Sequence, residues 1–86
     1  MERVQAGSIY QHFKGNLYII VTEAVHTETG EILVVYRNTA DNTKTWVRPI
    51  EMFLEHVDKP EYNYSGPRFH LIRDWDTDYI KPKSNE

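Results

Sequence analysis

Short runs of alternating apolar and polar residues follow one another along the 86-residue chain, and this pattern predicts antiparallel β-strands. The first run, residues 8–13, leads into the turn residues Lys-Gly-Asn at 14–16, so we expect a hairpin with the next strand. That second strand, residues 17–22, is rich in β-branched and aromatic side chains. Further strands are expected at residues 32–37, 44–48 and 68–72.

A helical spacing follows Pro49, which suits the first turn of a helix because it has no amide hydrogen to donate. The apolar residues at helical spacing after it are Ile50, Phe53, Leu54 and Val57. We expect one or two helical turns that plug the β-structure. Residues 59–67 contain two prolines and a glycine and are expected to form an irregular loop.

Together these elements predict a mainly β fold, a small antiparallel SH3-like β-barrel of about five strands with one short helical turn before the last strand. Residues 1–73 are expected to form this single domain. Apolar alternation stops after it, so residues 74–86 are expected to be an acidic, partly ordered C-terminal tail.

Two of the predicted strands are apolar on both faces. Residues 17–21 and 32–35 do not alternate, although a strand with one face in water should. We therefore expect the outer face to be covered, either by the tail through Trp75, Tyr79 and Ile80 or by a second copy of the chain.

Composition narrows the class of protein. Hydrophobic residues make up 40% of the chain and aromatic residues 13%, which is enough for one domain with a modest core. The chain has no cysteine, which excludes disulfides and thiolate sites and favours a reducing compartment. The N-terminus lacks the apolar run of a signal peptide, and no apolar segment is long enough to span a bilayer. We therefore expect a cytoplasmic protein with no membrane partner.

The distribution of charge argues against one class of partner. The net charge is −3, and residues 74–86 supply −2 of it with two basic and four acidic residues, which leaves −1 for residues 1–73. A protein that coats double-stranded DNA should be strongly basic. That partner is therefore not expected.

Five blocks of sequence resemble the bacterial and phage DUF1653 family, in the order and spacing of that family. They are YQHFKGNLY at 10–18, HTET at 26–29, LVVYR at 33–37, WVRPIEMFLE at 46–55 and RF at 68–69. The resemblance covers about residues 7–70. It implies a small barrel of unknown function, often encoded as a stand-alone short protein, with no catalytic residues to transfer. The chain departs from the family in its longer polar loop at 38–45 and in its acidic tail.

One predicted strand carries the candidate binding residues. Trp46 and Arg48 lie two positions apart, so they share a face of that strand. An arginine beside an aromatic face can bind a phosphate or carboxylate while a nucleobase or other ring stacks on the aromatic surface. Neighbouring strands and the first turn would bring further basic and aromatic residues to it. The candidate ligand-binding set is Trp46, Arg48, Tyr36, Arg37, His12, Lys14 and Arg68.

The same pair has a structural alternative, and the sequence leaves both open. In this alternative Trp46 packs as part of the core, as one tryptophan often does in a small barrel. Arg48 then lies along the indole ring and extends to Glu51 or Glu55.

Motifs for catalysis or metal binding are missing from the sequence. The four histidines, His12, His26, His56 and His70, lack the spacing of metal ligands. The acidic run at 74–78 resembles a calcium loop, but Tyr79 stands where glycine is needed and Asn85 where glutamate is needed. A phosphate-binding glycine loop and a nucleophile elbow are also missing. We expect no metal, no cofactor and no enzymatic activity.

Two functions are compatible with this sequence. The first is a non-catalytic binding module for an anionic, nucleotide-like or single-stranded nucleic-acid ligand. The second is a protein-interaction or homo-oligomeric assembly module without a small-molecule ligand. It would use the doubly apolar strands and Met52, which falls outside the apolar stripe of its helical turn.

Overall fold

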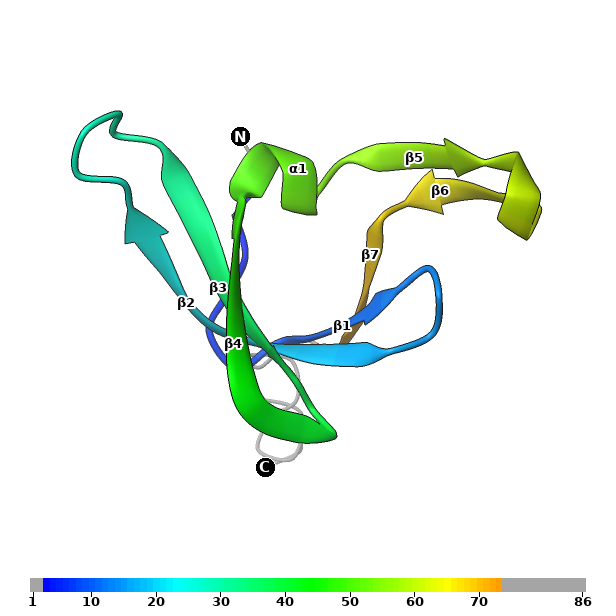
Figure 1. The fold of residues 1–86 in the computed structure, drawn as a ribbon, viewed down its shortest axis with the longest axis horizontal. Coiled ribbons are helices and arrows are strands. Elements are labelled where there is room, and N and C mark those ends of the chain that lie inside the picture. The colour runs from blue at the N-terminus through cyan, green and yellow to red at the C-terminus, as the bar shows by residue number, and fades with distance from the viewer. Residues whose placement is uncertain (1–2, 74–86) are drawn as a thin grey trace, which may run out of the picture.

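The computed structural model describes residues 3–73, in which the chain forms seven strands, one α-helix and one 3-10 helix (Figure 1). Their bounds are β1 Ile9–His12, β2 Leu17–Val25, β3 Ile32–Asn38, β4 Asp41–Pro49, α1 Ile50–Phe53, β5 His56–Lys59, η1 Pro60–Tyr62, β6 Tyr64–Pro67 and β7 Phe69–Arg73. No helix in this part of the chain is long and apolar enough to cross a membrane. The expected acidic tail and its calcium-like run lie outside the described residues.

Five of the strands form one antiparallel sheet in the order β4-β3-β2-β1-β7, which confirms the mainly β class. Within residues 3–73, β4 and β7 are the two edges of this sheet and do not pair with each other. The closed SH3-like barrel is therefore not confirmed. The chain leaves β4 through α1 and a second hairpin, β5 and β6, before it returns as β7, so this excursion connects the two edge strands (Figure 1).

The segment expected to be an irregular loop instead forms that second hairpin. β5 and β6 pair antiparallel, with Val57 opposite Gly66. Pro60 opens the 3-10 turn between them, and Asn63 adopts a left-handed φ of 53° that asparagine tolerates well. Pro67 is the last residue of β6, where its missing amide hydrogen interrupts little of the ladder. The expectation of a loop was wrong because these residues form a turn and a strand end.

The short helical turn expected after Pro49 is confirmed, but the apolar spacing that continues to Val57 does not extend the helix. It makes a single turn, which ends where the amide of Leu54 donates to the carbonyl of Ile50 at 3.0 Å. Val57, expected on the same helical face, lies in β5 and is buried there. Strand pairing, which satisfies the backbone groups of residues 56–59, therefore takes precedence over the continuation of the helix.

Cross-strand pairing divides the large sheet into two faces. Tyr36 in β3 pairs with Ile20 in β2 and Trp46 in β4, so all three point to the inner face, which α1 covers. The intervening positions point outwards. They include a set of apolar side chains that we call the outer apolar stripe, namely Ile9, Ile19, Leu33, Val35 and Val47.

The core lies on the inner face and is centred on Phe53. Its members are Val4, Tyr10, Ile20, Val34, Tyr36, Ile50, Phe53 and Phe69. Phe53 is fully buried and stacks on Phe69 with ring centroids 4.0 Å apart and an interplanar angle of 7°. The rings of Tyr10 and Tyr36 meet it edge-on, each at 5.2 Å. One helical turn thus supplies the side chain around which the sheet packs.

Replacement of this ring should destabilise the whole domain. Phe53→Ala removes a fully buried aromatic side chain, and we expect the free energy of unfolding to fall by about 3–5 kcal/mol. Met52→Ala, at the adjacent and exposed position of the same helix, should change it by less than about 0.5 kcal/mol. Urea unfolding followed by circular dichroism measures both values. Equal losses in the two variants would contradict the central role of Phe53.

Candidate functional site

A cleft of about 220 Å³ opens on the inner face, and we call it the arginine cleft. Each of the five strands of the large sheet contributes to it: β1, β2, β3 and β7 supply one residue each and β4 supplies two. Its lining residues are His12, Tyr18, Tyr36, Trp46, Arg48 and Phe69. None of them carries a carboxylate, so the lining combines aromatic rings with positive charge.

Strand register explains why these residues meet. Tyr36 pairs with Trp46, and Arg48 lies two residues farther along the same face of β4. On the other side of the cleft, His12 in β1 pairs with Phe69 in β7. Directly paired residues in an antiparallel sheet share a face, so the two sides of the cleft project in the same direction.

Arg48 is held at the centre of the cleft by contacts with aromatic residues. Its Nε donates to the hydroxyl of Tyr36 at 3.3 Å, and its guanidinium carbon lies 5.7 Å from the ring centroid of Phe69. Neither contact uses a carboxylate. Residues 3–73 make two ion pairs, Arg3 with Glu23 and Arg68 with Glu55. Arg48 takes part in neither, so its Nη groups are not paired with a carboxylate within these residues.

Trp46 forms the exposed side of the cleft. It is 46% exposed and is not part of the core. The ammonium group of Lys44 lies 6.0 Å from the centroid of its ring. The structural alternative required a buried Trp46 and an Arg48 paired with Glu51 or Glu55. The described residues show an exposed indole, and Glu55 accepts from Arg68 instead.

His12 connects the cleft to the β1–β2 turn. Its Nδ1 accepts a hydrogen bond from the amide of Lys14 at 3.1 Å, and its ring meets Phe69 edge-on at 5.0 Å. Burial lowers the pKa of His12, and the nearby charges of Arg68, Lys14 and Arg48 lower it further. Three cationic side chains therefore act on this single imidazole, which marks it as a focus of positive potential.

The structure brings most of the predicted site residues together. Trp46, Arg48, Tyr36 and His12 line the cleft itself. Lys14 and Arg68 lie beside it, close enough to His12 to lower its pKa. The guanidinium of Arg68 is partly committed, since its Nη2 donates to Glu55 at 3.1 Å, although its buried Nε has no partner in the described part of the chain.

Arg37 is the predicted residue that lies elsewhere. It pairs with Ile19 and Thr45, so its side chain points to the outer face of the sheet. Conversely, the sequence-based set missed Tyr18 and Phe69. Both are aromatic residues within predicted strands, and the alternation that places Tyr18 on the face of Ile20 was a usable signal. The position of Phe69 beside His12 depends on the pairing of β1 with β7, which sequence spacing does not reveal.

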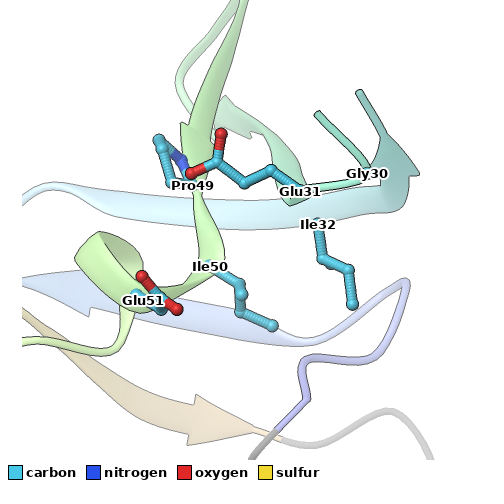
Figure 2. Close-up of a pocket in the computed structure, with 6 residues that line it drawn as sticks. All are labelled: Gly30, Glu31, Ile32, Pro49, Ile50 and Glu51. Atoms are coloured by element: carbon cyan, nitrogen blue, oxygen red, sulfur yellow. The ribbon is translucent and has the colours of Figure 1, made fainter. Parts of the chain in front are cut away.

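A second pocket of about 220 Å³ lies between the β2–β3 turn and the start of α1, and it differs in charge (Figure 2). Glu31 and Glu51 flank it, while Ile32 and Ile50 provide apolar surface. Two carboxylates disfavour an anionic ligand there. Residues 3–73 also contain no cluster of three or more histidine, aspartate or glutamate side chains able to hold a metal ion.

Comparison with known proteins identifies the family. Residues 8–71 match the family described as "Protein of unknown function (DUF1653)". The chain belongs to the DUF1653 family. It is also similar to the crystal structure of a DUF1653 protein from Bordetella bronchiseptica, with 26% sequence identity, a TM-score of 0.68 and coverage of 81% of this chain and 90% of that chain. No curated protein matches the chain.

The DUF1653 segment spans every residue of the arginine cleft, from His12 to Phe69. The cleft therefore belongs to the part of the chain that defines the family. The family description assigns no function, so a function has to be inferred from the chemistry of the cleft.

The lowered pKa of His12 predicts a pH-dependent stability. A histidine in the unfolded chain has a pKa of about 6.5. Below that pH the unfolded chain binds more protons than the folded one. The free energy of unfolding therefore falls as the pH drops toward the lower pKa of folded His12. Above pH ~6.5 this loss is absent. Wild-type protein should thus lose more unfolding free energy between about pH 7.5 and about pH 5.5 than a His12→Asn variant.

Asparagine is the matched control, because its side-chain oxygen can accept the amide of Lys14 as Nδ1 of His12 does, without titrating. Denaturant unfolding at the two pH values measures both proteins. The other histidines are common to both and cancel in the comparison. An equal loss in wild type and variant would show that His12 carries no shifted titration.

Proposed function

We propose that the protein is a non-catalytic binding module whose arginine cleft holds an anionic ligand with a planar ring, of the nucleotide or single-stranded nucleic-acid type. The observation that carries the proposal is Arg48 beside the exposed ring of Trp46. A guanidinium offers a bidentate donor for phosphate, and an open indole face offers a stacking surface for a base.

The charge around the cleft supports an anion. Arg48 lines it, and Lys14 and Arg68 lie close enough to the cleft to lower the pKa of its lining residue His12. The lining contains no acidic residue, whereas Glu31 and Glu51 flank the separate pocket of Figure 2, which is lined by Pro49. A ligand phosphate in the cleft would relieve the mutual repulsion of these cations as well as pair with them.

The aromatic contacts support a preorganised cation. Arg48 is hydrogen-bonded to a tyrosine that is itself buried, and Phe69 below it belongs to the core. The guanidinium therefore loses little conformational freedom when a ligand binds. The exposed indole of Trp46 adds a flat apolar surface that would otherwise remain in water.

Titration of tryptophan fluorescence tests this function. Trp46 is one of two tryptophans, so the titrations use a Trp75→Phe background in which the signal reports Trp46. Mono-, di- and cyclic nucleotides and short oligonucleotides are the probes. We expect saturable quenching, and Arg48→Ala should raise Kd by about 10- to 150-fold, the loss expected for a charged hydrogen bond of about 1.5–3 kcal/mol.

Arg37→Ala is the matched control, since it removes the same charge from the outer face one residue along β3 from Tyr36. Its Kd should stay within about twofold of the starting protein. Quenching that is absent at millimolar ligand, or that Arg48→Ala leaves unchanged in a folded protein, removes the proposed function.

The outer apolar stripe supports a second candidate, which is homo-oligomeric assembly. It places Val47, 56% exposed, on the opposite face of the sheet from the cleft. Self-association through this face would bury apolar surface without blocking the cleft, so the two functions are compatible.

Light scattering coupled to size exclusion tests the assembly. The mass should be a multiple of 10.2 kDa at high micromolar concentration. Val47→Lys, which places a charge in the stripe, should shift the mass to that of one chain. Thr45→Lys, exposed on the same face but outside the stripe, is the control and should retain the assembly. A wild-type mass of one chain argues against this candidate.

A further inference from the structure

The size of the arginine cleft limits what it can hold. Pockets that enclose small-molecule ligands usually measure roughly 300–1,000 Å³, and this cleft measures about 220 Å³. It therefore accommodates part of a ligand, such as one base and an adjoining phosphate. The remainder of the ligand has to extend along the protein surface.

A second cleft lies next to the first and offers that surface. Its volume is about 440 Å³, and its lining residues are Gln11, His12, Phe13, Gly15, Tyr64 and His70. His12 lines both clefts, and its ring lies 4.4 Å from that of Phe13 between centroids, so the two clefts adjoin at His12. We call this second cavity the hairpin cleft, because it lies between the β1–β2 turn and β6.

The hairpin cleft contains its own aromatic platform. Phe13 stacks on Tyr64 with centroids 5.4 Å apart and an interplanar angle of 15°, and Tyr62 meets Phe13 edge-on at 5.5 Å. The hydroxyl of Tyr64 donates to the carbonyl of Pro67 at 2.6 Å, which fixes the orientation of the ring. These three rings are not part of the core cluster.

Positive charge accompanies this platform as it does in the first cleft. The ammonium group of Lys14 lies 5.3 Å from the ring of Tyr62 and 6.0 Å from that of Phe13. The backbone amide of Lys14 also donates to His12, so the backbone from which this ammonium group extends is held at the junction of the two clefts. Rings and cations thus alternate from Trp46 and Arg48, through His12 and Lys14, to Phe13 and Tyr64.

We propose that the two clefts bind consecutive nucleotides of one single strand, with one base on Trp46, the next on the Phe13–Tyr64 platform, and the phosphate between them at His12 and Lys14. This inference rests on the proposed function and specifies its ligand as an oligonucleotide. Aromatic platforms that alternate with cations are how proteins hold single strands. A duplex does not fit this arrangement, because its bases are already stacked on one another.

Binding measured against oligonucleotide length tests the inference. In the Trp75→Phe background, thymidine monophosphate, the phosphorylated dithymidine dinucleotide, the corresponding uridine pair and a matched duplex are titrated while Trp46 fluorescence is recorded. We expect the dinucleotide to bind about 5- to 150-fold more tightly than the mononucleotide, the gain from one further stacked base of about 1–3 kcal/mol. Backbone amide spectra should show shifts at Gly15 and Tyr64 with the dinucleotide alone.

Variants of the hairpin cleft separate binding from folding. Phe13→Leu removes the aromatic platform but keeps an apolar side chain at this position. It should reduce dinucleotide affinity to that of the mononucleotide, whose own affinity stays the same. Lys14→Gln changes an exposed side chain, so it should preserve the fold. It should reduce several-fold the affinity that the dinucleotide gains over the mononucleotide. Arg37→Gln deletes the same charge on the outer face and should leave the gain intact.

The possible results distinguish the two proposals. If mononucleotide and dinucleotide bind equally and Gly15 and Tyr64 do not shift, the second stacking site is overturned while the proposed function stands. If no nucleotide binds, both are overturned. Tighter binding of the duplex than of the single strand also overturns the inference. A gain with the thymidine or the uridine pair alone supports it and identifies the strand as DNA or RNA.

Discussion

The stack of Phe53 on Phe69 is the contact on which the rest of the structure depends. One ring comes from the single-turn helix and the other from the last strand, so the stack joins the two ends of the excursion that contains the second hairpin. Without it, β7 would lose its main anchor to the core, and β7 also supplies one side of the arginine cleft. In so small a domain, a single buried aromatic pair accounts for a large share of the stability.

Core and cleft share side chains, and this explains how an exposed site can be rigid. Phe69 is part of the core and also lies beneath the guanidinium of Arg48. Tyr36 is buried by its ring and presents its hydroxyl to the same guanidinium. The chain is acidic overall, yet Arg48 lines this cleft and Lys14 and Arg68 lie beside it, while two carboxylates flank a separate pocket. The lining of the cleft itself carries no carboxylate, which favours an anionic ligand there.

Much of the candidate site could be predicted because the side-chain period of a strand is two. Trp46 and Arg48 had to share a face once their segment was a strand, and the predicted set placed both Tyr36 and Arg37 with them. The choice between those two depends on register, because a slip of one residue turns every side chain to the other face. Register depends in turn on the β3–β4 turn, and β4 begins at Asp41, three residues before the expected start. Tyr36 consequently faces the cleft and Arg37 faces away.

The sequence by itself determined the local conformations, namely the strands of the large sheet and the helical turn after Pro49. It also determined which reactive groups are present: many aromatic and basic residues, no cysteine and no catalytic motif. Alternation and turn residues are local properties, so sequence analysis can detect them. Only the tertiary structure decided that the sheet stays open, that residues 56–67 pair as a hairpin, and that His12 meets Phe69. These outcomes depend on contacts between residues far apart in the chain. Their free energies come from packing and pairing partners that no local pattern of residues specifies.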